Sequence, residues 1–216
     1  MPTIPKIVFY FDVLSVFSYI GFEFMEKYTA LWGIEVEYRP FNLGQVMRNT
    51  KNMLSPNKGP FLITDARRTS SITKIPFKGE PTKFPYNSTT ALRTLQYLKT
   101  HHPRLMVPAM RRLWRMEYVE RRAPESADDI KQALDGLVDA RVVEEAISVP
   151  DTLEAVKQNT ADVEQMKGFG APTILVYRKG ESEPQMYFGS DRFEHIAIYL
   201  DKEFYPMKQL FSAPKI

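Results

Sequence analysis

The stretch that decides the fold is residues 6–22, KIVFYFDVLSVFSYIGF. Residues 7–11 are all apolar, which predicts a buried β-strand. A short turn containing Asp12 follows, and the apolar residues after Ser15 have the spacing of a helix. A helix N-terminus leaves backbone N–H groups free and carries the positive end of the helix dipole. This strand–turn–helix junction is therefore suited to holding an anion.

Ser15 stands where the N-cap of this helix is expected, and serine is among the best N-cap residues. Two interpretations stay open on the residues alone. Ser15 either only caps the helix, which is what serine commonly does at such a junction, or it also takes part in chemistry at the helix start.

Composition narrows the classes of function. The chain has 216 residues, which fits one domain or one domain with a sizeable insertion, and an apolar fraction of 44% supplies ample core. A net charge of +3 is too small to imply a polyanionic partner. The absence of cysteine excludes structural disulfides, zinc–thiolate sites, iron–sulfur clusters and a dithiol redox role for the chain itself.

The sequence predicts no membrane span, because it has no run of 18 apolar residues. A strand pattern begins by about Ile7, which leaves no room for the apolar region of a cleavable signal peptide. An Arg-rich amphipathic presequence is also absent from the given N-terminus. We therefore expect an intracellular protein.

The rest of the first half continues in a β-α-β order. The first helix should run to about residue 32 and end at Gly33, and residues 34–38 alternate as a half-buried strand closed by Pro40. A short helix is expected over 41–50, followed by a polar loop over 51–59. From 60 to 168 the pattern is mostly helical, with helices expected at 61–74, 88–99, 105–121, 128–138 behind Ser126 as N-cap, and 152–167.

Strand character returns at residues 173–177 and 185–189, which a turn containing Gly180 should join as a hairpin. A last helix is expected from 190 to about 204, and Asp191 and Glu194 have the spacing of a capping box. The remaining residues to 216 are predicted to be a tail.

Residues 10–23, YFDVLSVFSYIGFE, resemble the N-terminal signature of kappa-class glutathione transferases, which reads close to FYDVLSPYSWLGFE. The related bacterial 2-hydroxychromene-2-carboxylate isomerases share this signature. Residues 188–192, FGSDR, resemble a second motif of the family, and Gly-Ala-Pro at 170–172 resembles the segment before its third strand. The match departs at Val16, where proline is usual, and at Phe17, where tyrosine is usual, so any contribution of a tyrosine hydroxyl is missing here.

The resemblance implies an α/β fold with a thioredoxin-like core (β-α-β … β-β-α) interrupted by an all-helical insertion, as in DsbA-type oxidoreductases. The order of the predicted elements favours the same architecture. We predict a discontinuous glutathione-binding domain formed by residues 1–59 and 169–216, and a helical insertion domain over residues 60–168. Ser15 takes the place of the first cysteine in the C-x-x-C motif of such oxidoreductases, so the thiol must come from a ligand.

For the site, the resemblance implies that Ser15 donates a hydrogen bond to the glutathione sulfur. A role as a base is not expected, because no histidine lies nearby in sequence. Free N–H groups, the helix dipole and a hydroxyl donor each favour thiolate over thiol. The glutathione-binding residues implied are Ser15, Val16, Phe17, Asn52, Ala171, Pro172, Ser190 and Asp191, with Lys58 as a further candidate.

Each of these residues has a distinct implied role. Pro172 would be cis and face the first helix, and the Ala171 backbone would pair with the cysteinyl backbone of glutathione as an added strand. Ser190 would hold the γ-glutamyl carboxylate, and Asp191 the γ-glutamyl ammonium. On the residues alone, Pro172 as an ordinary strand-start proline and 188–192 as a helix start without ligand remain open.

Two clusters are predicted to carry no chemistry. His101, His102 and His195 lack metal-ligand spacing, and we predict no metal site. Residues 111–122 hold five arginines beside Trp114, but Glu117 and Glu120 are interspersed at helical spacing. We interpret this segment as a solvated helix face with ion pairs and predict no nucleic-acid partner.

The sequence thus predicts a kappa-class glutathione S-transferase with glutathione as co-substrate and no permanently bound cofactor. The second substrate would be a small electrophilic or hydrophobic molecule lying against apolar residues of the insertion. Two alternatives stay open, namely a glutathione-dependent isomerase and a non-catalytic DsbA-like partner or chaperone. The resemblance also implies a homodimer in mitochondria or peroxisomes, although residues 214–216, Pro-Lys-Ile, match only the basic residue of an S-K-L address.

Overall fold

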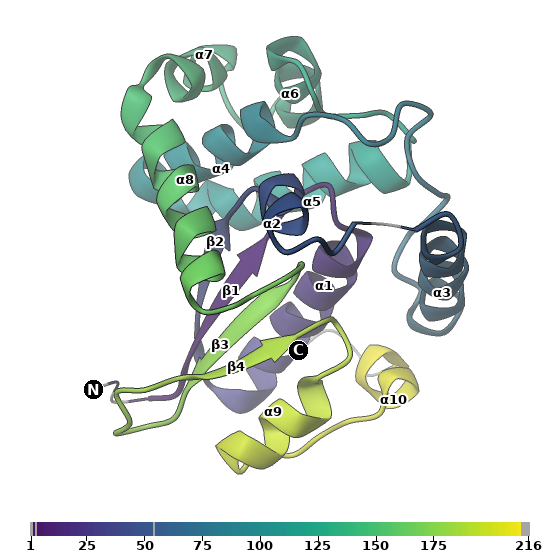
Figure 1. The fold of residues 1–216 in the computed structure, drawn as a ribbon, viewed down its shortest axis with the longest axis vertical. Coiled ribbons are helices and arrows are strands. Elements are labelled where there is room, and N and C mark those ends of the chain that lie inside the picture. Colours follow the sequence, from purple (N-terminus) through teal and green to yellow (C-terminus); the bar gives the residue numbers. More distant parts are fainter. Residues whose placement is uncertain (1, 3, 54, 213–216) are drawn as a thin grey trace.

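The fold is built on a four-stranded sheet. The computed structural model describes residue 2, residues 4–53 and residues 55–212. The strands are β1 (Lys6–Phe11), β2 (Glu35–Pro40), β3 (Thr173–Tyr177) and β4 (Gln185–Phe188), in the spatial order β2-β1-β3-β4 (Figure 1). β2 runs parallel to β1, whereas β3 is antiparallel to both β1 and β4. The predicted α/β class and the predicted strand pairings are confirmed.

One face of the sheet is covered by α1 (Val16–Trp32), the helix that opens at Ser15. Gly33 ends it in the left-handed conformation, with φ 61°, which glycine adopts without steric cost. Phe9 and Phe11 point from β1 into this layer and are fully buried. On the same side, α9 (Phe193–Leu200) and α10 (Met207–Ser212) pack aromatic rings against α1.

The other face of β1 presents Val8 and Tyr10, because side chains alternate along a strand. These pack in a second, smaller core with Val46 from α2 (Leu43–Asn49) and Val163 from α8 (Pro150–Gln165). Each face of the central strand is therefore buried, which explains why residues 7–11 read as an uninterrupted apolar run.

The remaining helices lie between β2 and β3 in sequence. They are α3 (Lys58–Thr73), α4 (Thr89–His101), α5 (Pro103–Tyr118), α6 (Ala127–Leu134) and α7 (Ala140–Ser148), followed by α8. Helices α4 to α8 pack on one another, while α3 stands apart from them against α1 and α10 (Figure 1). The division into two domains at residues 59 and 168 stays a prediction.

Two helices were not expected from the sequence. The α7 helix begins behind Asp139, which caps it, and buries Val143 and Ala146. At nine residues it is too short to give a strong periodic signal. The α10 helix lies in the predicted tail and is held by Phe211, whose ring lies 4.9 Å from that of Phe24 on α1.

The start and end of the last predicted helix were also wrong. The α9 helix begins at Phe193 behind Arg192, without a side-chain cap, and ends at Leu200 rather than near 204. Asp191 pairs with Arg192 instead of closing a capping box with Glu194. The predicted cap at Ser126 is confirmed and forms a full capping box with Asp129.

Candidate functional site

The candidate site lies where β1 ends and α1 begins. The Ser15 backbone N–H donates to the Asp12 carbonyl at 3.1 Å, which closes the turn. The Ser15 hydroxyl oxygen accepts from the Ser18 N–H at 3.1 Å, and the hydroxyl proton is donated to the Ala171 carbonyl at 3.2 Å. Ser15 is therefore the predicted N-cap, and it also ties α1 to the segment before β3.

The first turn of α1 keeps donors free for an anion. Ser15 satisfies the Ser18 N–H through its side chain and the Tyr19 N–H through its carbonyl. The N–H groups of Val16 and Phe17 precede any intrahelical acceptor, and the first turn carries no acidic residue. The helix dipole and these two N–H groups therefore favour negative charge beside Ser15.

The segment before β3 lies directly against this helix. The Ala171–Pro172 peptide bond is cis, as predicted. A Cβ added at Gly21 of α1 would lie 3.3 Å from Pro172 Cγ and 3.4 Å from Ser190 Cβ. The absence of a side chain at Gly21 thus lets Pro172 and Ser190 both approach α1 closely.

The predicted residue Asn52 reaches the same segment from the loop before α3. Its side-chain amide donates to the Phe169 carbonyl at 2.8 Å. The Lys58 ammonium at the start of α3 donates to the Asn52 side-chain oxygen at 3.1 Å. Lys58 is exposed and Asn52 is half-buried, so they place one cation and one amide at the rim of the site.

Ser190 and Asp191 lie at the turn after β4, where Gly189 has a φ of 101° that favours glycine. The Gly189 N–H donates to the Pro172 carbonyl at 3.0 Å, which fixes this turn beside Pro172. The exposed Asp191 carboxylate pairs with its neighbour Arg192, so a ligand ammonium would compete with Arg192 for it.

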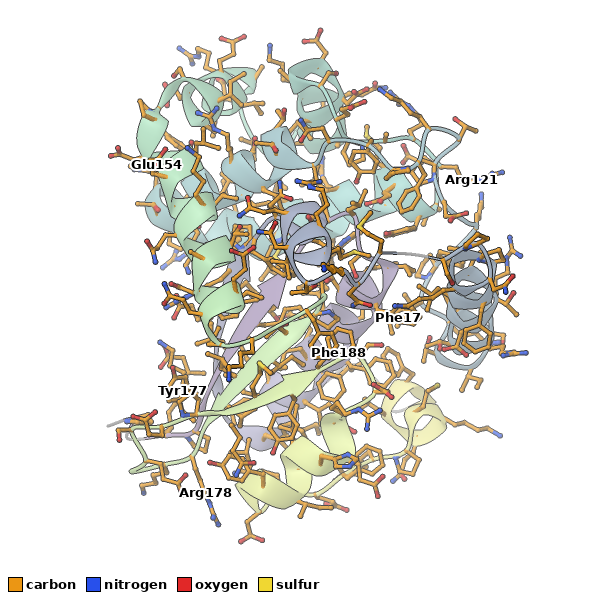
Figure 2. The ribbon with its side chains drawn as sticks, viewed as in Figure 1. Phe17, Arg121, Glu154, Tyr177, Arg178 and Phe188 are labelled. Atoms are coloured by element: carbon orange, nitrogen blue, oxygen red, sulfur yellow. The ribbon has the colours of Figure 1, made fainter. Side chains whose placement is uncertain are left out.

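An apolar rim borders these polar groups. The rings of Phe169 and Phe188 lie 4.5 Å apart and each remains about two-fifths exposed. A Cβ at Gly170 would lie 2.6 Å from the Phe188 ring, so a side chain there would displace that ring. Met53 and Phe61 expose 58% of their surfaces in the loop before α3 and in its first turn. Figure 2 shows Phe17 and Phe188 near the centre of the view, at the start of α1 and the end of β4.

A buried acidic cluster behind the Ser15 turn was missed. Asp12 is fully buried and accepts from the Leu14 N–H at 3.0 Å, the Leu43 N–H at 2.9 Å and the Ser88 hydroxyl at 3.1 Å. Burial raises the pKa of Asp12 to about 6, against the opposing effect of these donors. The signal in the sequence was a single aspartate directly after an apolar strand. A carboxylate in that position is buried and therefore needs hydrogen-bond donors around it.

The interpretation of Glu117 was wrong. It was predicted to lie on the solvated face of α5, yet it is fully buried. Glu117 follows Leu113 by four residues, and residues so spaced lie on the same helix face. That spacing was the signal that could have found it.

The surrounding arginines do form the predicted ion pairs. Arg111 pairs with Glu23 at 3.1 Å, and Arg115 with Glu120 at 3.4 Å. The described residues contain no group of three metal-ligating side chains, and none of their helices is long and apolar enough to cross a bilayer.

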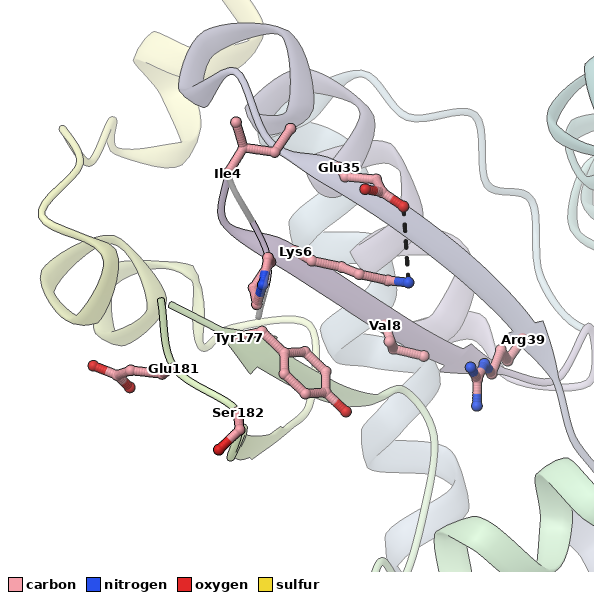
Figure 3. A pocket seen from close by; sticks show the side chains of 9 residues that line it. Ile4, Lys6, Val8, Glu35, Arg39, Tyr177, Glu181 and Ser182 are labelled. Carbon is pink, nitrogen blue, oxygen red and sulfur yellow. Dashed lines mark ion pairs between the residues drawn. The ribbon is translucent and has the colours of Figure 1, made fainter. Parts of the chain in front are cut away.

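One surface hollow lies away from these groups. It has a volume of about 530 Å³ and lies over the opposite end of β1, where Lys6, Glu35, Arg39 and Tyr177 line it (Figure 3). Its charges are largely paired with one another, with Lys6 contacting Glu35 at 3.7 Å.

Comparison with known proteins agrees with this geometry. The model of the DSBA-like thioredoxin domain matches residues 6–201. Glutathione S-transferase kappa 1 of Caenorhabditis elegans is 32% identical over 94% of this chain and 93% of its own length. The chain belongs to the kappa family of glutathione S-transferases, within the DSBA-like thioredoxin domain family.

Further similarities support this membership of the kappa family. Human glutathione S-transferase kappa 1 is 27% identical over 94% of each chain. Among solved structures, a 2-hydroxychromene-2-carboxylate isomerase superposes with a TM-score of 0.70 at 22% identity, covering 91% of this chain and 94% of its own. The predicted DsbA-like thioredoxin fold is therefore confirmed. Which residues of this kappa-family chain bind glutathione stays a prediction, although the structure brings Ser15, Ala171, Pro172 and Ser190 together.

Proposed function

We propose that the chain is a glutathione S-transferase that activates the glutathione thiol at the N-terminus of α1. The observation that carries the proposal is the position of the Ser15 hydroxyl, which lies between the helix start and the Ala171 carbonyl. The relatives from Caenorhabditis elegans and human, at 32% and 27% identity, are kappa-class glutathione S-transferases, which supports this activity.

The chemistry needs a thiolate and no base from the protein. A free thiol has a pKa near 8.5, and the helix dipole, the N–H groups of Val16 and Phe17 and a hydroxyl donor each lower it. The thiol proton leaves to solvent. The thiolate then donates its electron pair to an electrophilic carbon, forming the C–S bond while a leaving group departs or a conjugated double bond takes up the electrons.

Binding of glutathione would also free the Ser15 proton. In this structure that proton is donated to the Ala171 carbonyl. If the cysteinyl N–H of glutathione adds to Ala171 as a strand, it takes over this carbonyl. The Ser15 hydroxyl can then rotate toward the sulfur while its oxygen keeps the Ser18 N–H, so the donor becomes available only when the tripeptide is in place.

The ends of the tripeptide would be held by the polar rim. Ser190 and the adjacent turn would bind the γ-glutamyl carboxylate, and Asp191 would exchange Arg192 for the γ-glutamyl ammonium. Asn52 and Lys58 would lie beside the glycyl end, where Lys58 offers positive charge to a carboxylate.

The electrophile would lie on the apolar rim. The paired rings of Phe169 and Phe188 border the segment that holds Ala171, and their exposed faces suit a flat aromatic or unsaturated electrophile. The electrophile was expected against apolar residues of the insertion, and this stays a prediction. Among the exposed apolar residues, Phe61 and Ile72 come from the insertion helix α3.

Family resemblance further supports a homodimer and a mitochondrial or peroxisomal location. Sedimentation of the purified chain tests the first, and fractionation of cells expressing it tests the second. The C-terminal residues 214–216, on which a peroxisomal address would depend, lie outside the described residues.

Equilibrium binding of glutathione to wild type and Asp191→Ala tests the proposed site. We expect about tenfold weaker binding, since one charged hydrogen-bond partner is lost. Asp128→Ala is the matched control, because Asp128 is an exposed carboxylate on the distant α6. An unchanged dissociation constant in Asp191→Ala removes this residue from the site.

Product analysis separates the alternatives. A transferase consumes glutathione in proportion to the electrophile, whereas an isomerase returns it unchanged after turnover. A chain that binds no glutathione would contradict both activities and leave a non-catalytic partner protein.

A further inference from the structure

Three polar atoms lie buried without a hydrogen-bond partner in one place behind the Ser15 turn. They are the two carboxyl oxygens of Glu117 and the hydroxyl oxygen of Tyr86. Unpaired buried polar groups are uncommon, and an unpaired buried carboxylate costs far more than a neutral carboxyl group. Glu117 is therefore neutral in the folded protein, and burial raises its pKa well above the ordinary value.

Hydrogen bonds hold the turn in front of this cluster at the carbonyls of Val13 and Leu14 and at the Leu14 N–H. The Tyr118 hydroxyl donates to the Leu14 carbonyl at 2.9 Å, and the Asp12 carboxylate accepts from the Leu14 N–H at 3.0 Å. The indole N–H of Trp114 donates to the Val13 carbonyl at 3.1 Å. Because Ser15 follows Leu14 directly, these contacts from α5 and Asp12 determine where the Ser15 hydroxyl points.

The two buried acids differ in their partners. Asp12 accepts from two backbone N–H groups and from the Ser88 hydroxyl, so it is the acid that carries a charge. Glu117 accepts from no backbone N–H among the described residues, and the donors that face it are the hydroxyls of Tyr86 and Tyr118, which lower its pKa less than burial raises it. The groups that face Glu117 are Tyr86 from the loop before α4, Tyr118 on α5 and Asp12 from the turn, with Glu80 also acting on Tyr118. None of these is a cation.

Tyr118 has one proton and two acceptors facing it. A neutral Glu117 leaves that proton on the Leu14 carbonyl, as observed. An ionised Glu117 would be the stronger acceptor, since hydrogen bonds to a charged group are about twice as strong. The Tyr118 proton would then turn to Glu117, and the Leu14 carbonyl would lose its partner.

We propose that Glu117 is a positioning residue for Ser15. As a neutral acid, Glu117 leaves the Tyr118 hydroxyl hydrogen-bonded to the Leu14 carbonyl. The proposal deepens the proposed function and, for its effect on the thiol, rests on it. Loss of the Glu117 proton releases the turn, so Ser15 no longer presents its hydroxyl in the orientation that reaches a ligand sulfur.

The carbonyl carbon of Leu14, labelled with ¹³C and followed by NMR across pH, reports the turn without any ligand. We expect its chemical shift to stay constant through neutral pH in wild type and to move at alkaline pH. In Glu117→Gln, which keeps the neutral form at every pH, the shift should not move. A Glu117→Gln variant that titrates like wild type would overturn the proposal.

The bound thiol provides the second measurement. Ultraviolet absorbance should show about tenfold less glutathione thiolate at neutral pH in Tyr118→Phe, with wild-type levels in Glu117→Gln. Tyr86→Phe is the matched control, because it removes the other hydroxyl that faces Glu117 while leaving the Leu14 carbonyl bonded. Wild-type thiolate in Tyr118→Phe contradicts the proposal. Failure of the wild type to bind glutathione contradicts the proposed function instead, and the Leu14 shift then decides the role of Glu117.

Discussion

The carboxyl groups near the two ends of β1 have opposite environments and opposite pKa shifts. At its carboxyl end, Asp12 and Glu117 are fully buried without a cation, and burial raises the pKa of both. Near its amino end, Glu37 on β2 contacts Lys6 at 3.0 Å, Arg39 at 2.8 Å and Lys99 at 2.7 Å. Hydrogen bonds from these cations lower the pKa of Glu37 against the opposing effect of burial.

The carboxyl group near the amino end of β1 therefore stabilises the fold, whereas the two near its carboxyl end serve the site. An acid with three cations stabilises the fold in its ionised form, although the exposure of its partners limits the gain. Buried acids without cations destabilise the fold at neutral pH. Such groups persist where they serve a site, and both lie directly behind the Ser15 turn.

The largest effect is expected from Asp12→Ala. It leaves three buried donors without an acceptor, at about 1–3 kcal/mol each. Removal of a buried charge offsets part of this, because a folded pKa of about 6 lies above the unfolded value and costs wild type roughly 3 kcal/mol above pH 6. We expect a net loss of about 2 kcal/mol at pH 7 and about a hundredfold lower kcat/KM, since the turn before Ser15 is released.

Denaturant unfolding at several pH values checks this prediction. Wild type loses stability as pH rises from about 4 to 6, while the variant lacks this dependence, so the gap between them should narrow over that range. A gap that widens with pH would mean that Asp12 has a lowered pKa.

The next largest effect is expected from Glu117→Gln. In wild type the unfolded chain releases the Glu117 proton above about pH 4.3, while the folded chain keeps it, so stability falls by about 1.4 kcal/mol per pH unit. Glutamine removes this dependence. The stability of the variant relative to wild type should therefore rise with pH above the unfolded value of about 4.3.

The free energies of unfolding of Glu117→Gln and of the control Glu120→Gln, each relative to wild type, should be measured in denaturant across pH. Glu120 lies on the same segment but is exposed, and its substitution should change little at any pH. A pH-independent difference for Glu117→Gln would show that Glu117 is ionised in the folded protein.

The smallest effect is expected from Glu37→Gln, at about 1 kcal/mol at pH 7 after allowance for solvent screening. The folded pKa is lowered, so the stabilisation is present above the unfolded value near 4.3 and disappears as pH falls. It should also shrink in high salt. Glu35→Gln is the control, because Glu35 is more exposed and its ion pair with Lys6 is longer, at 3.7 Å. Equal losses in the two variants would contradict the importance of the three-cation cluster.

Local patterns were sufficient for much of the fold. The apolar run before Asp12, the cap at Ser15 and the cis Pro172 depend on neighbours in sequence or on a motif, and each was predicted correctly. The burial of Glu117 and the ion-pair partner of Asp191 were not predicted. Glu117 was predicted to be exposed because charged side chains usually are. Its spacing from Leu113, however, puts it on the buried face of the helix. Asp191 forms an ion pair with Arg192, and a capping pattern in the sequence does not predict this pair.

The contact between Ser15 and Ala171 marks the limit of prediction from sequence. These residues are separated by 156 positions, and their hydrogen bond depends on the packing of α1 against the segment before β3. The family motif predicted that both residues serve one site, but not that they would be hydrogen-bonded to each other.

The most direct test of the central claim is the ultraviolet thiolate absorbance of bound glutathione across pH, compared between wild type and Ser15→Ala. We expect a thiolate in wild type well below the free-thiol pKa of about 8.5, and a pKa at least one unit higher in Ser15→Ala, since a hydroxyl donor to the sulfur is lost. An equally lowered pKa in both proteins would contradict the claim, because the helix N-terminus alone would then activate the thiol and Ser15 would serve only as its cap.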